Sequence, residues 1–127
     1  MNLISYIKDN NNCIGLLISE SHFIEISNHI KTNNAITLIQ NFSEYKHILQ
    51  NLDLENEKKE LISNYHIISP IPTPTSLRDA YSFRQHVETS RKNRNLEMIE
   101  EFDHFPVYYY SNHNSVTGPG EISVKKN

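Results

Sequence analysis

The stretch LRDAYSFRQHVETSRKNR, residues 77–94, decides how the second half of this 127-residue chain is interpreted. It combines a carboxylate at Asp79, a phenol at Tyr81, an imidazole at His86 and four arginines. Such a run is either a solvated amphipathic helix or part of a catalytic site. The choice depends on where the helix begins.

Two helix start signals compete in this stretch. Ser76 and Ser82 each begin a capping box, because an acid or an amide follows three residues later. If Ser76 caps the helix, Asp79 lies in the first turn and only complements the helix dipole. If Ser82 is the cap, the residues before it are extended, and Asp79 and Tyr81 project on the same side. His86 then falls in the first turn, where the positive helix end keeps the imidazole neutral and suited to a general base.

Composition narrows the class of protein. The net charge is −3, and acids and bases are interspersed. The sequence therefore has no basic patch of the kind that binds nucleic acid or a membrane surface. The single cysteine, Cys13, excludes an intrachain disulfide and is typical of a reducing compartment. No apolar run approaches transmembrane length, and no signal segment is visible. We therefore expect a cytoplasmic location.

The first half of the chain predicts an α+β domain over residues 1–69. The runs LISYI, CIGLLI and HFIEI, separated by turn residues, predict a small antiparallel meander over residues 3–26. Apolar residues at helical spacing from Ile36 to Leu52 predict a helix, and LENEKKELI predicts a second that closes near Asn64. The asparagine runs at 10–12 and 33–34 are interpreted as loop filler.

Prolines at 70, 72 and 74 forbid a helix and mark a boundary near residue 70. The second part, residues 70–127, contains a β-rich PVYYY, a turn-rich SNHNSVTGPG and a strand-like EISVKK. Because a strand at that point has no later partner in the sequence, we expect the polypeptide to end partway through a fold.

Two consecutive segments carry a family resemblance. RDAYSFRQHVETSRKNRNLEMI followed by FPVYYYSNHNSVTGPG resembles the fumarylacetoacetate hydrolase family over about residues 68–124. The resemblance rests on Asp-x-Tyr-x-x-x-x-His, a basic segment and Pro-Val-x-Tyr, in that order. It implies an α+β fold in which a small β-rich N-terminal domain with helices precedes the first elements of a mixed β-roll catalytic domain, truncated here.

The resemblance also implies a site and a reaction. The reaction would be metal-dependent hydrolysis of a carbon–carbon bond in a β-diketo or acylpyruvate-type acid, in which water attacks a metal-polarised carbonyl. The partners would be the small keto acid and, for the parent protein, a second copy in a homodimer, with no nucleic acid and no membrane. The implied roles are a Mg²⁺ or Ca²⁺ ligand at Asp79, a general base at His86, and substrate contacts at Tyr81, Tyr109 and Arg94, with Arg91 as the second candidate arginine.

This chain also departs from the family. Ala80 stands where a bulky aromatic is usual, and the family's Glu-x-Glu pair and later aspartate ligand lie beyond the Gly-Pro-Gly turn. The acid-x-acid pair at 55–57 is interpreted as a solvated face, and the pair at 101–103 as ordinary helix-end acids in the link before PVYYY. We therefore expect negligible turnover from the isolated chain. The alternatives are a decarboxylase, isomerase or hydratase of the same family, or a non-catalytic fragment that folds partly or pairs with another chain.

Overall fold

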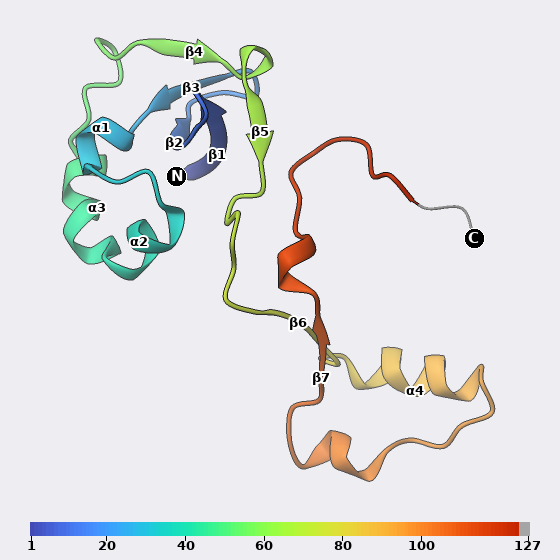
Figure 1. Cartoon of the computed structure of the whole chain (residues 1–127). Coiled ribbons are helices and arrows are strands. Elements are labelled where there is room, and N and C mark those ends of the chain that lie inside the picture. Colours follow the sequence, from blue (N-terminus) through green and yellow to red (C-terminus); the bar gives the residue numbers. More distant parts are fainter. Residues whose placement is uncertain (125–127) are drawn as a thin grey trace. The chain divides into compact units, whose positions relative to one another are not determined.

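The computed structural model describes residues 1–124 and divides the chain into two compact units (Figure 1). Unit 1 contains Met1–Thr73 together with the segment that begins at Val116, and unit 2 contains Pro74–Ser115. Each unit is described by itself. The domain limits expected from the sequence, 1–69 and 70–127, stay a prediction.

Unit 1 is built on a curled five-stranded antiparallel sheet with the order β4-β3-β2-β1-β5. The predicted meander over residues 3–26 is confirmed, because its three strands pair in sequence order. Its first hairpin turns through Asp9 and Asn10, which adopt φ angles of 49° and 62°. Asparagine and aspartate tolerate this left-handed conformation, which suits a tight hairpin. The strands of the meander are β1 (Asn2–Lys8), β2 (Asn11–Leu17) and β3 (His22–Glu25).

Three short helices follow the meander: α1 (Ser27–Ile30), α2 (Ala35–Gln40) and α3 (Phe42–Gln50). Asn34 caps α2, since its side-chain oxygen accepts hydrogen bonds from the backbone N–H groups of Ile36 and Thr37. The single helix predicted between Ile36 and Leu52 is two helices. The chain leaves helical geometry at Asn41, where ψ is 27°.

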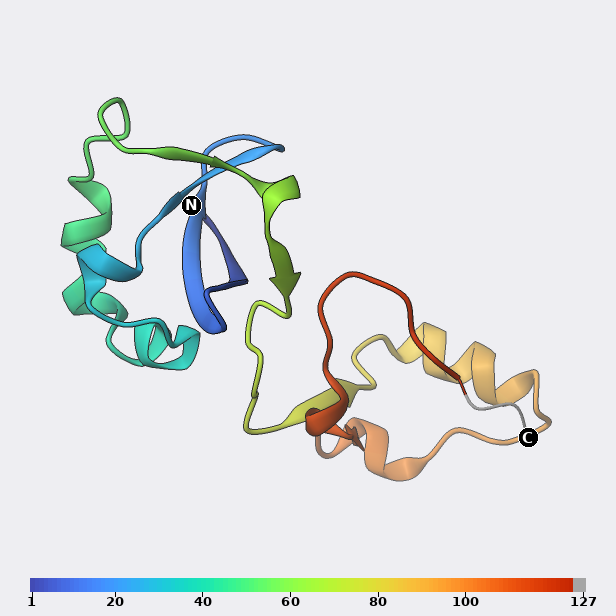
Figure 2. The same cartoon turned by 45° about the horizontal axis from the view of Figure 1, so that its top comes forward.

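Successive side chains of β2 point to opposite faces of the sheet, so its apolar residues are divided between two cores. Ile14 and Leu16 face the helices and pack with Leu38 and Leu49, on the side where Figures 1 and 2 show α1–α3. Cys13 points to the other face. There it joins a smaller aromatic core, in which its thiol is free and buried.

That aromatic core depends on a glycine. The rings of Tyr6, Phe23 and Tyr65 lie within 5.3 Å of one another, centroid to centroid, in tilted and edge-to-face arrangements. A Cβ at Gly15 would stand 2.5 Å from Cδ2 of Phe23. Gly15 therefore leaves the space that the Phe23 ring fills.

The helix predicted over LENEKKELI is wrong. Residues 54–57 form turns, and the chain then enters strand β4 (Lys59–Leu61), which pairs with β3 so that His22 lies opposite Leu61. A single 3₁₀ turn, η1 (Ile62–Asn64), leads to β5 (His66–Ile68), which pairs with β1. Sheet pairing with distant residues therefore overrides the local helical pattern.

Unit 2 contains a two-stranded sheet, one helix and two 3₁₀ turns. Val87 of α4 is 3% exposed and is the one buried residue among residues 74–115. The unit therefore has a very small core. Its elements are β6 (Leu77–Ala80), α4 (Arg84–Lys92), η2 (Glu100–Asp103), β7 (Tyr108–Ser111) and η3 (His113–Ser115).

The segment after unit 2 returns to unit 1. A Cβ on Gly118 would stand 2.6 Å from Cα of Ile68, so only glycine allows this close approach to the end of β5. The expected strand over EISVKK is not formed at residues 121–124, and its last residues lie outside the described part of the chain. Within residues 1–124, no helix is long and apolar enough to cross a membrane.

Candidate functional site

The β6–β7 ladder places Asp79 directly opposite Tyr109. Residues that face each other across an antiparallel pair project on the same side of the sheet. Tyr81 extends this side, because its backbone N–H donates to the carbonyl of Val107, one step beyond the end of the ladder. Three of the residues implied by the resemblance therefore share one face of unit 2, which we call the Asp79 face.

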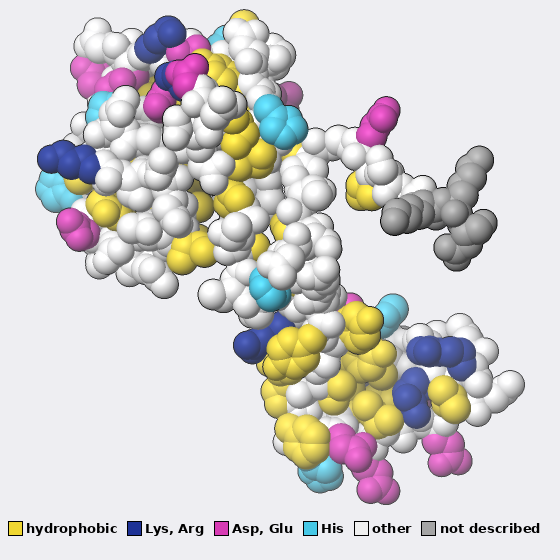
Figure 3. Space-filling view, viewed as in Figure 1, with side chains coloured by type: hydrophobic (Ala, Val, Ile, Leu, Met, Phe, Trp, Pro, Cys, Tyr) yellow, Lys and Arg dark blue, Asp and Glu magenta, His cyan; other side chains and the backbone are white. Residues whose placement is uncertain are grey.

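The other face of the same two strands has a different character. The guanidinium carbon of Arg78 lies 5.4 Å from the ring centroid of Tyr110 and 6.0 Å from that of Tyr108. These distances allow cation–π attraction. The three consecutive tyrosines are 45–69% exposed, and hydrophobic side chains gather on the surface of this unit (Figure 3). The sheet thus separates Tyr109, beside the acid, from the two tyrosines beside the arginine.

The structure decides between the two possible helix starts. Residues 77–80 are a strand, so the helix does not begin at Ser76. Helix α4 begins at Arg84, one residue later than a Ser82 cap would give, and its N-cap residue is Phe83. The Ser82 hydroxyl donates to the Ala80 carbonyl at 3.5 Å instead of capping the helix.

His86 occupies the first turn of α4, as the second alternative required. Its side chain lines an open groove together with Ser82, Phe83 and Thr89, at the N-terminal end of the helix. Asp79 is not among the residues that line this groove. The structure therefore brings Asp79, Tyr81 and Tyr109 to one face, and it gives His86 a groove of its own.

The candidate arginines are held at the C-terminal end of α4. The Nε–H of Arg94 donates to the Ser90 carbonyl at 3.1 Å, and its terminal nitrogen donates to the Ser90 hydroxyl at 2.9 Å. Arg91 donates through Nε to the carbonyl of Glu97. Arg94 thus binds oxygens of the last turn of α4, a common use of arginine near a helix end, whereas Arg91 binds a carbonyl of the loop that follows the helix.

One carboxylate of each acid-x-acid pair is engaged in an ion pair. Glu57 pairs with His29 at 3.1 Å, and Asp103 pairs with Arg84 at 3.3 Å. Within residues 1–124, no three histidine, cysteine or acidic side chains converge as a metal site. Asp79 is the carboxylate that the β6–β7 ladder places opposite Tyr109.

One cavity of unit 1 was not predicted from the sequence. The two asparagine runs, interpreted as filler, line one cavity in unit 1 together with Ser5 and Thr73. The only available signal was the repetition of one polar residue type in two turn regions, and spacing alone does not bring the two regions together.

The comparisons with known proteins show a likeness of fold. No family model matches the sequence, and no curated protein matches it. Among solved structures, a fumarylacetoacetate hydrolase from the psychrophile Exiguobacterium antarcticum aligns over 92% of this chain with a TM-score of 0.55 and 12% identity. This chain spans 37% of the length of that protein. The chain therefore has a fold like part of a fumarylacetoacetate hydrolase.

Proposed function

We propose that this chain supplies one part of the active site of a hydrolase that cleaves a carbon–carbon bond in a β-diketo acid of the acylpyruvate type. The observation that carries the proposal is the pairing of Asp79 with Tyr109 across β6 and β7, with Tyr81 on the same face. The likeness of fold to a fumarylacetoacetate hydrolase and the order of the motif residues support it.

A divalent cation belongs to this proposal, and the described residues fit it only in part. Mg²⁺ and Ca²⁺ take six or more oxygen ligands, and carboxylates are preferred among protein side chains. The Asp79 face offers one carboxylate, and residues 1–124 hold no cluster of three metal-binding side chains. The remaining ligands would come from other protein.

The roles proposed for the other residues follow from their chemistry. Tyr81 and Tyr109 would donate phenolic hydrogen bonds to the oxygens of the keto acid on the Asp79 face. His86 would accept a proton from the attacking water, which requires the groove that it lines to open toward the substrate on the Asp79 face. Arg94 would bind the far carboxylate of the substrate, which requires its guanidinium to exchange the Ser90 oxygens for those of the acid.

A second candidate function is favoured by the exposure of the site. Tyr109 is 69% exposed and Tyr81 is 44% exposed, whereas catalytic hydrolase sites exclude water when they act. By itself the chain would then be non-catalytic and would act only with protein that covers this face. The decarboxylase, isomerase and hydratase alternatives share the same residues and stay open.

Ligand binding tests the proposal without requiring turnover. We expect acetylpyruvate, in the presence of Mg²⁺, to shift the NMR signals of Asp79, Tyr81 and Tyr109 in a saturable way. Tyr109→Phe should weaken binding by about fivefold, the effect of one neutral hydrogen bond. Tyr108→Phe is the matched control, because that ring lies on the opposite face of the same strand. No shift at the Asp79 face, or equal losses in both variants, would refute the proposed site.

A further inference from the structure

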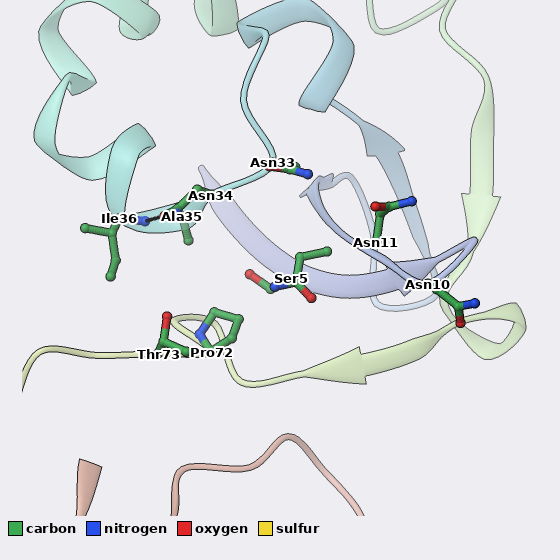
Figure 4. Close-up of a pocket in the computed structure, with 10 residues that line it drawn as sticks. Ser5, Asn10, Asn11, Asn33, Asn34, Ala35, Ile36, Pro72 and Thr73 are labelled. Carbon is green, nitrogen blue, oxygen red and sulfur yellow. Dashed lines mark hydrogen bonds between the residues drawn. The ribbon is translucent and has the colours of Figure 1, made fainter. Parts of the chain in front are cut away.

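Unit 1 contains a polar cavity that the proposed function does not use. Its volume is about 250 Å³, and Figure 4 shows Ser5 of β1 surrounded by three chain segments. One segment is the first hairpin turn, the second is the loop before α2, and the third is the pair Pro72–Thr73 after β5. Residues far apart in the sequence therefore meet at one hollow.

The lining of this cavity is rich in carboxamides and has no charged side chain. Asn10, Asn11 and Asn12 come from the hairpin, and Asn33 and Asn34 come from the loop before α2. A carboxamide presents one acceptor oxygen and two donor N–H groups, so neighbouring amides can bind groups that both donate and accept. A charged ligand would find no opposite charge in the lining, which favours a neutral ligand.

Hydrogen bonds hold three of the residues that surround the cavity in place. Ser5 is buried and its hydroxyl donates to the Pro70 carbonyl at 2.8 Å. Asn34 is fixed by its capping bonds to α2, and the side chain of Asn11 donates to the Asp9 carbonyl at 2.9 Å. Asn12 and Asn33 line the cavity as exposed side chains. They are the positions where a substitution leaves these supporting bonds in place.

The cavity also has an apolar wall. Ala35, Ile36 and Pro72 complete its lining, and Ser5 and Ala35 also border a second, largely apolar hollow on the same side of β1. A ligand that carries hydroxyl groups on one side and C–H groups on the other would match both surfaces. The volume is below the range of about 300–1,000 Å³ typical of pockets for drug-sized ligands, so the ligand is small.

We infer that this cavity is a binding site for a small neutral polyhydroxylated molecule, such as a monosaccharide or cyclitol. Amides of Asn12 and Asn33 bind adjacent hydroxyl groups, and the Ile36 and Pro72 side chains contact the C–H face. This site lies within unit 1, and it does not depend on the hydrolase proposal for unit 2.

NMR titration of the whole chain tests the inference. The probes are D-glucose, D-ribose and myo-inositol, with sodium glutarate as a small charged comparison. We expect at least one polyol to cause saturable shifts at Asn12, Asn33 and Thr73, and glutarate to cause none there. Asn12→Ala and Asn33→Ala should each weaken binding by about fivefold, as expected for the loss of one neutral hydrogen bond.

Asn64→Ala is the matched control, because Asn64 is an exposed asparagine of unit 1 that does not line the cavity. Its polyol affinity should equal that of the unaltered chain. The inference is overturned if none of the three polyols causes saturable shifts at the cavity of the unaltered chain. It is also overturned if the shifts persist unchanged in the Asn12→Ala/Asn33→Ala double variant, or if Asn64→Ala weakens binding equally.

Discussion

Asp79 and Tyr109 are cross-strand partners in the β6–β7 ladder, thirty positions apart in the sequence and opposite each other in the sheet. This register puts a carboxylate and a phenol on one face and leaves Arg78 with Tyr108 and Tyr110 on the other. A register slip of one residue would put Asp79 on the face of Tyr108 and Tyr110, and Arg78 on the face of Tyr109. The pairing therefore determines which tyrosine can act together with the acid.

The first prediction concerns cation binding at Asp79. Titration with Mn²⁺ should broaden the NMR signals of Asp79, Tyr81 and Tyr109 before others, because the carboxylate is the hard oxygen ligand on that face. Asp79→Asn should remove this selective broadening. Glu97→Gln, which alters an exposed acid beyond α4, should leave it unchanged. Broadening that follows Glu97 rather than Asp79 would contradict the assignment.

The second prediction concerns Gly15. Gly15→Ala should destabilise unit 1 by about 1–3 kcal/mol, the usual cost of overpacking a core, because the new methyl group meets Cδ2 of Phe23. Urea unfolding followed by tyrosine fluorescence measures the loss. In the double variant Gly15→Ala/Phe23→Leu, the loss of stability should be smaller than the sum of the losses in the two single variants. The reason is that leucine leaves room for the new methyl group at position 15. Strict additivity would show that the two residues do not compete.

The third prediction is a loss of stability at alkaline pH. Burial raises the pKa of the Tyr6 hydroxyl and of the Cys13 thiol, and the nearby Glu25 carboxylate adds to both shifts. A hydrogen bond to Glu25 raises the pKa of the Lys8 ammonium. In each case the folded-state pKa lies above the unfolded one. The stabilising contribution is therefore complete below the unfolded pKa and is lost as the pH rises toward the folded pKa.

This loss should begin near pH 8.5, where the thiol of an unfolded chain ionises, and steepen above about pH 10, where tyrosine and lysine follow. Urea unfolding at a series of pH values measures it. Cys13→Ala should remove the decline between about pH 8.5 and 10 and keep the later one. A free energy of unfolding that is constant across this range would contradict the burial of both groups.

The fourth prediction concerns the small core of unit 2. Val87→Ala should cost roughly 2 kcal/mol, because two buried carbon groups are removed from α4. Amide hydrogen exchange should then quicken throughout β6, α4 and β7, while β1 and β2 keep their protection. Glu88→Ala, at the adjacent exposed position, should have little effect on exchange. Unchanged exchange in the Val87 variant would show that this side chain does not hold the unit together.

Local pattern predicted the elements whose partners are close in the sequence. The three strands of the meander are adjacent, and their turns carry residues such as Asn10 that accept a left-handed backbone. Local pattern could not predict the strand at Lys59–Leu61, because that conformation depends on pairing with β3, nearly forty positions earlier. Charged residues at helical spacing misled the prediction there, since pairing with an existing sheet edge decided the conformation.

In the candidate site, too, local spacing predicted part of the arrangement and pairing with a distant strand decided the rest. Spacing placed Asp79 and Tyr81 on one side of an extended segment, but it left Ser76 and Ser82 as rival helix starts. The structure resolves this through β7, because a strand at residues 77–80 requires a partner and Tyr108–Ser111 supplies it. The asparagine cavity could not be predicted, because its walls come from three segments whose meeting is fixed only by the curled sheet.

Gly118 has a consequence for how unit 2 is tethered. The polypeptide leaves unit 1 after Thr73 and rejoins it from Val116 onward, where Gly118 approaches Ile68 closely. Unit 2 is therefore an insertion, anchored at both ends in the same scaffold. A protease that nicks the exposed residues 93–97 would cut the backbone once, and both resulting pieces would keep a share of unit 1. Such a nicked chain should migrate as two bands under denaturing conditions and as one particle under native ones.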